Sequence, residues 1–457
     1  MAHTDSRHLQ VSSGNSRSME RFESALELLQ GYYGDPLTMI DETLAEDPEF
    51  VMGHALRAGL LITAGDGTVA PLLRQTVEAA EALHGIANER ERRHIAAARA
   101  WLDGEFARAN QMYGDIVIDY PRDALALQVA HITDFLLGQS SMLRDRIAQV
   151  LPNWNARVPG FSHVLGMHAF GLEETHLYEQ AEERGRFALE LDPRDPWAIH
   201  AVAHVMEMQG RPDQGIGWLQ SRTEDWATDN MMAVHNWWHL ALFHLELGHA
   251  DQVLALYDER IRATRSAVAL DVVDATAMLW RLQLRGIDVG ARWAELADTC
   301  EARGAEGTYA FNDVHAGIAF LGDDRPASFT RLMANMRRAA AGSGTNAAMT
   351  REVGLPVIEA LYAFEACDYD HAIELLMPVR LIAHRFGGSH AQRDILNLTL
   401  IEAALRGGRA NLACALAAER MELKPMTPSL SALVQRASSL YRESADAHAG
   451  RSAARAA

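Results

Sequence analysis

The stretch HLYEQAEERGRFALELDP, residues 176–193, decides the fold because an earlier stretch, GEFARANQMYGDIVIDYP at residues 104–121, has the same plan. Each begins at a helix break, has an aromatic residue two or three places on, and continues with small and apolar residues at helical spacing. Each then reaches a proline 17 residues after its start. Shorter echoes begin at Gly248, Cys367 and Gly407. The spacing predicts repeated helices separated by tight turns.

This plan resembles the tetratricopeptide repeat, in which helix A, a tight turn at a small residue, helix B and a terminating proline form one unit. Neither helix can cover its apolar face alone, so neighbouring units stack and share one core. Glycine and proline fall between the periodic segments, and alternating β-type runs are absent from the sequence. We therefore expect an all-α, tetratricopeptide-like solenoid of helical hairpins with a central groove over residues 19–440. A flexible N-terminal arm (1–18) and a disordered tail (441–457) are expected to flank it.

Composition narrows the partners and the compartment. The formal net charge of −19 predicts no binding to nucleic acid or to an anionic membrane, because both are recognised mainly through lysine and arginine. Three widely spaced cysteines without a CxxC pair argue against a disulfide framework or a cysteine-type zinc site. They fit a reducing cytoplasm, where we expect the protein to reside. We find neither a secretory signal pattern nor an apolar run of the roughly 20 residues that span a bilayer.

Five longer motifs resemble the tetratricopeptide repeat protein 38 family. They are GMHAFGLEE (166–174), HAVAHVMEMQGR (200–211), HNWWHLALFHLELG (235–248), FNDVHA (311–316) and GGSHAQRD (387–394). The chain has His176 where we expect glycine in that family. The resemblance covers most of the chain, and it implies mainly a fold rather than a defined biochemical role.

Aligning three A helices on the turn residues His176, Gly210 and Gly248 brings polar side chains into equivalent positions. Counting back thirteen, ten, six and three residues gives, in turn, His163, Trp197 and His235; Gly166, His200 and Trp238; Phe170, His204 and Leu242; and Glu173, Glu207 and Leu245. These offsets differ by three or four residues, so each set lies along one helix face. In tetratricopeptide repeats that face lines the groove. The opposite face, including Ile199 and Met206, is expected to pack between helices.

The pair His200 and His204 has a spacing that places two imidazoles on adjacent turns of one helix. Such a pair can chelate a metal ion, and Glu207 or the pair His235 and His239 could complete the shell. However, Ala201 stands where HExxH enzymes have glutamate, and spacing alone does not bring four ligands together. Hydrogen-bonded groove residues are the plainer alternative. We predict a pocket with no metal ion and no other cofactor. The predicted catalytic residues are His200, His204, Glu207 and His235, and the predicted substrate-binding residues are His163, Glu173, Trp197, Trp238, His239, Asp313, His315, His390 and Arg393.

Adjacent residues on a helix do not share a face. In GLEETH, Glu173 is therefore expected to face the groove, and Glu174 is expected to be a solvated charge. In FNDVHA, Asp313 and His315 are two residues apart and lie on nearly opposite sides of a helix. They are therefore not expected to pair directly.

The motif GGSHAQRD predicts the start of a helix, because Ser389 and Gln392 have the spacing of a capping box. His390 and Arg393 then lie in the first turn, where free backbone N–H groups favour a carboxylate or a phosphate. The alternative is that Arg393 and Asp394 form a structural ion pair.

Two functions from different classes follow. In the first, the solenoid curls until its groove becomes a pocket for a small molecule. A histidine base would then give a hydrolase or a lyase by hydrolysis or addition–elimination. In the second, the protein is a scaffold whose open groove binds a peptide of a protein partner, or which associates with itself. A groove lined by His, Glu and Trp in an acidic protein favours a cationic or neutral partner.

Overall fold

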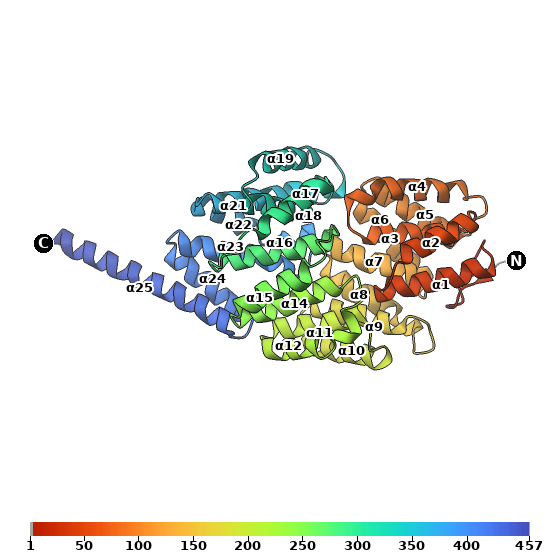
Figure 1. The fold of residues 1–457 in the computed structure, drawn as a ribbon, viewed down its shortest axis with the longest axis horizontal. Helices are drawn as coiled ribbons and strands as arrows, with labels where there is room; N and C mark the ends of the chain where they lie inside the picture. Colours follow the sequence, from red (N-terminus) through yellow and green to blue (C-terminus); the bar gives the residue numbers. More distant parts are fainter. Residues whose placement is uncertain (1–2, 305, 457) are drawn as a thin grey trace.

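The computed structural model describes residues 3–304 and 306–456, and nearly all of them lie in helices or in the turns between helices (Figure 1). Two short antiparallel strands, β1 (His3–Thr4) and β2 (Gln10–Val11), precede the helices. The N-terminal helices are α1 (Ser16–Gly31), α2 (Pro36–Glu46), α3 (Val51–Thr63), α4 (Ala70–Ala82), α5 (Glu89–Leu102), α6 (Phe106–Asp119), α7 (Ala124–Leu136) and α8 (Ser140–Val150).

The middle of the chain contains α9 (Phe161–Glu173), α10 (Tyr178–Leu191), α11 (Pro196–Met208), α12 (Pro212–Gln220), α13 (Thr223–Trp226), α14 (Ala233–Glu246), α15 (Ala250–Leu256) and α16 (Ala269–Leu284). The C-terminal helices are α17 (Arg292–Arg303), α18 (Ala310–Gly322), α19 (Pro326–Ala340), α20 (Thr345–Met349), α21 (Leu355–Glu365), α22 (Tyr369–Val379), α23 (His390–Arg406), α24 (Ala410–Leu423) and α25 (Pro428–Ala456). Short 3-10 turns are η1 (Gly67–Val69), η2 (Leu151–Asn153) and η5 (Ala383–Phe386), and π-helical turns are η3 (Tyr257–Ile261) and η4 (Thr350–Gly354).

The helices pair as hairpins, so the chain is an all-α, tetratricopeptide-like helical-hairpin solenoid, as the repeats predicted. In the middle of the chain the inner helices are α9, α11, α14 and α16, and each packs against the outer helix that follows it, α10, α12, α15 or α17. The face of α11 that carries Ile199 and Met206 packs against Trp218 and Leu219 of α12. The predicted packing face is therefore confirmed.

The turn residues used for the alignment have the same backbone conformation. Gly210 and Gly248 have φ angles of +63° and +79°, and His176 has φ of +64° at the corresponding turn. Glycine adopts this left-handed conformation without cost, whereas histidine pays a steric penalty of about 1 kcal/mol. Histidine nevertheless makes the same turn, so the three positions are structurally equivalent.

Inner and outer helices differ in how many of their faces are buried. All residues of α9 from His163 to Glu173 are buried, whereas α10 buries only Ala181, Gly185, Ala188 and Leu189. A helix that is buried all round has neighbours on every side. The inner helices therefore contact other protein on the side that would face an open groove.

Segments far apart in the sequence close the superhelix around these inner helices. The Asn312 side chain donates to the carbonyl of Gly65 over 3.0 Å, and the Tyr309 hydroxyl donates to the carbonyl of Leu136 over 2.8 Å. Helix α23 packs on α16, and α25 contacts α14. The central groove expected from the repeats is thus closed into interior cavities.

The two ends of the chain differ from the expected flexible arm and disordered tail. Within residues 1–18, the structure places Val11 in the core and pairs Arg7 with Glu23 over 2.6 Å, which holds the β1–β2 hairpin against the first helices. At the other end, α25 continues through residues 441–456 and projects from the body (Figure 1). Its sequence is poor in large apolar residues but rich in alanine, the strongest helix former. No helix in the described part of the chain has the length and apolar character needed to cross a membrane.

Candidate functional site: a buried histidine cluster

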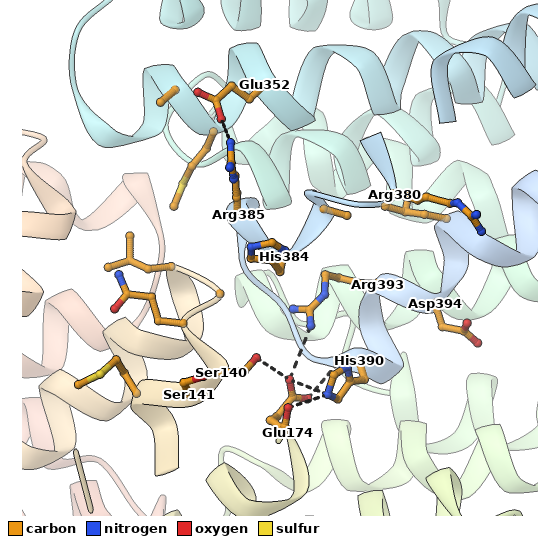
Figure 2. Close-up of a pocket in the computed structure, with 18 of the residues that line it drawn as sticks. Ser140, Ser141, Glu174, Glu352, Arg380, His384, Arg385, His390, Arg393 and Asp394 are labelled. Carbon is orange, nitrogen blue, oxygen red and sulfur yellow. Dashed lines mark hydrogen bonds and ion pairs between the residues drawn. The ribbon is translucent and has the colours of Figure 1, made fainter. Parts of the chain in front are cut away.

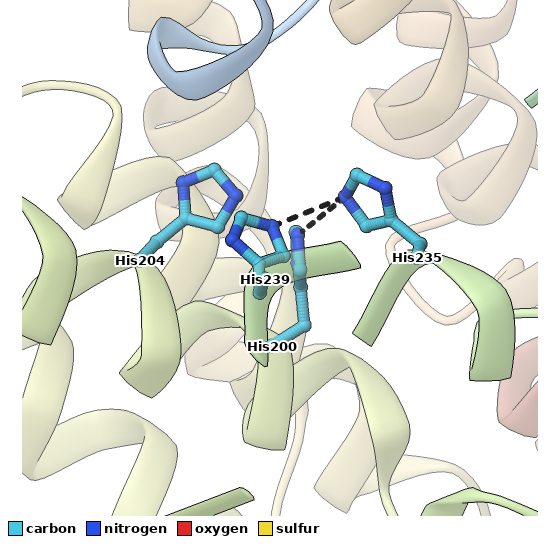
Figure 3. Close-up of side chains that lie close together, drawn as sticks. All are labelled: His200, His204, His235 and His239. Atoms are coloured by element: carbon cyan, nitrogen blue, oxygen red, sulfur yellow. Dashed lines mark hydrogen bonds between the residues drawn. The ribbon is translucent and has the colours of Figure 1, made fainter. Parts of the chain in front are cut away.

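Four histidine side chains meet where α11 packs beside α14. His200 and His204 lie one turn apart on α11, and His235 and His239 lie one turn apart on α14. Their exposed fractions are between 0% and 4%. One ring nitrogen from each lies within 4.8 Å of one from every other, and Figure 3 shows the four rings turned toward one shared space. We call these four residues the histidine cluster.

Two short nitrogen–nitrogen contacts join the cluster. The Nε2 atom of His235 lies 3.0 Å from Nε2 of His200 and 3.3 Å from Nε2 of His239. Because neutral imidazole carries only one N–H, at most one nitrogen of each pair can act as the donor.

Carboxylates lie behind the rings. Asp274 of α16 accepts a hydrogen bond from Nδ1 of His235 over 2.7 Å, and its other oxygen lies 3.5 Å from the Gln392 amide. A carboxylate oxygen of Glu173, on α9, lies 3.3 Å from Nδ1 of His204. A carboxylate beside Nδ1 keeps the proton on that nitrogen, so Nε2 faces the cluster with a free lone pair.

The third carboxylate comes from α11 itself. An oxygen of Glu207 lies 3.5 Å from Nδ1 of His239, and the other oxygen binds the Lys424 ammonium over 3.0 Å. Burial alone would raise the pKa of Glu207, but the Lys424 charge and His239 hold it well below its usual range. Lys424 follows α24, so the C-terminal repeats help to orient this ring.

The electrostatic environment shifts the pKa values of three of the imidazoles in different directions. Burial lowers the pKa of His200 well below its ordinary value, and the neighbouring rings lower it further. Burial and the nearby His204 likewise keep the pKa of His239 well below normal. Burial would also lower the pKa of His204, but the charge of Glu173 outweighs it and raises that pKa. The protein thus keeps His200 and His239 neutral at physiological pH.

Aromatic side chains surround the cluster on the remaining sides. The His235 ring stacks on Trp238 with centroids 5.4 Å apart and an interplanar angle of 15°. Phe170 lies 4.9 Å from Trp197 and 5.3 Å from His200 between ring centroids. These rings exclude water from the cluster, which strengthens every electrostatic interaction inside it.

A cavity of about 130 Å³ reaches the cluster from the side of α7 and α16. Its polar end is formed by His200, His235 and the Gln392 side chain. The rest of its lining is mostly apolar and aromatic: Tyr32, Ile132, Phe135, Leu136, Trp197, Met232, Leu270, Val273, Tyr309 and Phe311. This volume is well above the roughly 10–15 Å³ that a cavity needs to hold one water, so the cavity has room for several water-sized groups.

His390 and Arg393 belong to a different cavity, a more open one of about 940 Å³ (Figure 2). The backbone N–H of His390 donates to Glu174 over 2.9 Å, and an Arg393 nitrogen lies 3.6 Å from the same carboxylate. The prediction that Glu174 is a solvated charge is wrong, because this residue is only 3% exposed. We call Glu174, His390 and Arg393 the Glu174 latch, since it joins the turn after α9 to the start of α23.

The capping box at the start of α23 is confirmed, because Ser389 and Gln392 bond each other's backbone N–H groups. The suggested pairing of Arg393 with Asp394 is wrong: Asp394 binds Arg420 through two contacts of 2.7 Å. Two further arginines beside the open cavity, Arg380 and Arg385, also have carboxylate partners.

Three other predicted site residues lie outside the cluster. His163 is 3.3 Å from an oxygen of Asp195, which also caps α11. Asp313 accepts from the backbone of Gly307 over 2.8 Å, and His315 bonds the carbonyl of Phe311 over 2.8 Å. As predicted, Asp313 and His315 bond different partners. The structure therefore brings together eight of the predicted residues: His200, His204, His235, His239, Glu173, Glu207, Trp197 and Trp238.

Sequence reasoning missed Asp274, Gln392 and Lys424. A signal for Asp274 exists, because it is a charged residue inside ALDVVDATAMLW, a segment that is otherwise almost entirely apolar. A buried carboxylate needs a partner, so such an aspartate points to a nearby cation or imidazole. The other two residues depend on how the superhelix closes.

No protein-family model matches this chain. Among solved structures, human IFIT1 as a dimer with PPP-AAAA is similar over 96% of both chains, with 13% identity and a TM-score of 0.42. Cut9 in the APC/C hetero-tetramer Cut9–Hcn1 is similar over 88% of this chain and 72% of its own, with 13% identity and a TM-score of 0.42. Yeast Tom70 is similar over 90% and 85%, with 12% identity and a TM-score of 0.31. At these low scores, no binding property or activity carries over to this chain.

Proposed function

We propose that the protein binds a small molecule in the interior cavity, with the polar group of the ligand against the histidine cluster. The observation that carries this proposal is the cavity itself, which joins a polar end at His200 and His235 to an apolar and aromatic wall. Ligand sites are typically enclosed and mostly apolar with a few converging polar groups. The closed inner face supports this reading over a peptide lying in an open groove.

The chemistry open to the site is proton transfer by histidine. With its Nδ1 proton donated to Asp274, His235 has an unprotonated Nε2, which lies beside His200 and His239 and can accept a proton from water or from the ligand. A water molecule that gives its proton to His235 can add to a carbonyl or similar carbon, and the imidazolium then returns the proton to the leaving group. Hydrolysis would follow from this addition. In an elimination, His235 would instead take a proton from a carbon of the ligand and return it to the group that leaves the adjacent carbon, so the protein is a proposed hydrolase or lyase.

A thermal-shift screen of the full chain against a broad set of metabolites tests the binding proposal. At a concentration 100 times its Kd, a ligand should raise Tm by about 3 °C for a chain of this length. The shift should disappear in His200→Gln, which alters the polar end, and in Val273→Phe, which fills the cavity. The control His168→Gln changes a buried histidine outside the cavity and should keep the shift. A shift that survives both cavity variants would contradict the proposal.

Binding to a protein partner or to a second copy is the second candidate function. It is favoured by exposed apolar side chains around the end of α24 and on the projecting α25: Met421, Leu423, Met426 and Tyr441 are between 45% and 61% exposed. Exposed apolar side chains that gather in one region mark protein contacts. Light scattering of the wild type and of a Leu423→Glu, Met426→Glu variant tests self-association. A wild type that stays monomeric at high concentration would exclude it.

The resemblance to the tetratricopeptide repeat protein 38 family and the cytoplasmic location remain predictions. The first implies a fold rather than an activity. The second is supported by three free thiols, of which Cys367 is exposed.

A further inference from the structure

We propose that the histidine cluster binds one divalent transition-metal ion through the Nε2 atoms of His200, His204, His235 and His239. This goes beyond the proposed function, because a ligand can occupy the cavity with or without an ion. It also differs from the sequence prediction, which considered Glu207 or the pair His235 and His239 as completing a metal site with His200 and His204, but favoured a pocket without metal. The structure brings the four imidazoles together and places carboxylates behind them.

The position of the carboxylates decides which nitrogens carry protons. Asp274 accepts the Nδ1 proton of His235 over 2.7 Å, and Glu173 lies 3.3 Å from Nδ1 of His204. When each ring is neutral and carries its one proton on Nδ1, the Nε2 atoms of His235 and His204 present lone pairs to the centre of the cluster. Histidines that ligate metals almost always donate their other nitrogen to a carboxylate, a carbonyl or water.

The third ring, His239, has a carboxylate near its Nδ1 atom, although this nitrogen has no hydrogen-bond partner. Glu207 lies 3.5 Å from Nδ1 of His239, which leaves Nε2 of His239 facing Nε2 of His235 at 3.3 Å. With both Nδ1 atoms protonated, two lone pairs face each other across this contact. A cation between them turns that repulsion into two coordinate bonds.

Unsatisfied buried nitrogens point to the same place. Nε2 of His204 is buried without a hydrogen-bond partner, although its ring faces the other three (Figure 3). Buried polar atoms almost always have a partner, so such an atom needs an explanation. A bound ion supplies one.

The distances suit a tetrahedral ion. Metal–imidazole bonds of about 2.0–2.1 Å place tetrahedral ligands roughly 3.3–3.4 Å apart. The separations of 3.0 Å for His200 to His235 and 3.3 Å for His239 to His235 lie close to that value. All other separations are at most 4.8 Å, which small ring rotations can shorten. A set of four imidazoles suits zinc, copper, nickel or iron rather than calcium or magnesium.

The cavity gives the ion a role in the chemistry of a bound ligand. It touches the cluster at His200 and His235, so a ligand in the cavity could approach the ion from that side. This step, unlike metal binding itself, rests on the proposed function. With four imidazoles bound to a tetrahedral ion, a ligand in the cavity would reach the ion only as a fifth donor.

The test uses the untagged full chain after treatment with a chelator. Titration with zinc chloride, followed by calorimetry and elemental analysis, should give about one zinc per chain and a rise in Tm. His235→Gln and His239→Gln should each weaken zinc binding at least tenfold. His168→Gln, a buried histidine outside the cluster, should bind as the wild type does. A wild type that retains less than a fifth of an equivalent, or equal binding by all variants, would overturn the proposal.

Two further readouts keep the test decisive if the cluster variants fail to fold. Cobalt added to the wild type should give the intense visible absorption of a tetrahedral nitrogen site, and a weak octahedral spectrum would overturn the proposal. The metabolite screen repeated on metal-free wild type separates the two claims. Ligand shifts without zinc binding would overturn only the metal site. Zinc binding with no cavity-dependent ligand would count against only the proposed function.

Discussion

The histidine cluster and the Glu174 latch are built from the same kinds of side chain on neighbouring elements, but they differ in how their polar atoms are satisfied. In the latch, one oxygen of Glu174 accepts from the His390 backbone, the other lies near Arg393, and the His390 ring bonds the Glu174 carbonyl over 2.9 Å. In the cluster, Nδ1 of His200 and Nε2 of His204 have no partner at all.

The difference teaches which buried polar group to treat as a site. A set of groups that satisfy one another holds the fold together and has little left to offer a ligand. A set of groups whose lone pairs face one another, with no proton between them, needs a further atom such as a bound cation to satisfy them. We therefore assign stability to the latch and binding to the cluster, although the sequence suggested a role in binding for both.

The largest expected effect is on the latch. Glu174→Ala leaves the buried Arg393 guanidinium without a carboxylate and with only the Gly387 and Gly388 carbonyls as acceptors. Losing one partner of a buried ion pair typically costs about 3–5 kcal/mol of the free energy of unfolding. Urea unfolding followed by circular dichroism measures this loss. Glu174→Gln keeps an acceptor for the His390 backbone and should lose less. If Glu174→Ala lowers the free energy of unfolding by less than about 1 kcal/mol, the claim that the Glu174 latch stabilises the fold is contradicted.

An isolated unsatisfied atom sharpens the comparison. Burial raises the pKa of Asp313 to about 7, and one of its oxygens has no partner. Between its ordinary pKa of 3.8 and about 7, the folded protein holds a proton that the unfolded chain has released. The free energy of unfolding should therefore fall as pH rises through this window, by on the order of 4 kcal/mol, and then level off.

Asp313→Asn should flatten that slope, measured by urea unfolding at pH 5 and pH 8, and it should leave zinc binding unchanged. Asp251→Asn, at an exposed position, serves as the matched control. An unaltered slope in Asp313→Asn would show that burial of this carboxyl does not govern the pH dependence. Loss of zinc binding in Asp313→Asn would contradict the assignment of the zinc site to the histidine cluster, because Asp313 lies outside it.

The smallest effect on stability is expected in the cluster. His239→Gln replaces one polar side chain with another of similar length, so the free energy of unfolding of the metal-free protein should change by about 1–2 kcal/mol. Zinc binding should nevertheless weaken at least tenfold. A variant that loses as much stability as Glu174→Ala, and still binds zinc, would reverse the roles assigned to the two regions.

Local sequence pattern predicted the fold and the side chains that share one helix face. The turns at His176, Gly210 and Gly248 gave the correct alignment, because the same left-handed conformation ends each inner helix. That alignment placed His200 and His235 together on the strength of residue spacing alone. It is reliable because the period of the helix fixes which residues lie on one face.

The rest depended on how the superhelix closes, which local pattern does not encode. Gln392 and Lys424 reach the site from repeats far along the chain, and their arrival depends on the small rotation between successive repeats. His390 and Arg393 were correctly placed at a helix start. They lie in another cavity because their partner Glu174 faces a different direction from Glu173.

The convergence of four imidazoles is tested most directly by X-ray absorption at the zinc edge of the zinc-loaded wild type. We predict about four nitrogen donors at roughly 2.0–2.1 Å, with the outer-shell scattering of imidazole rings. A shell that contains sulfur, or six oxygen donors, would contradict a site made of these four histidines.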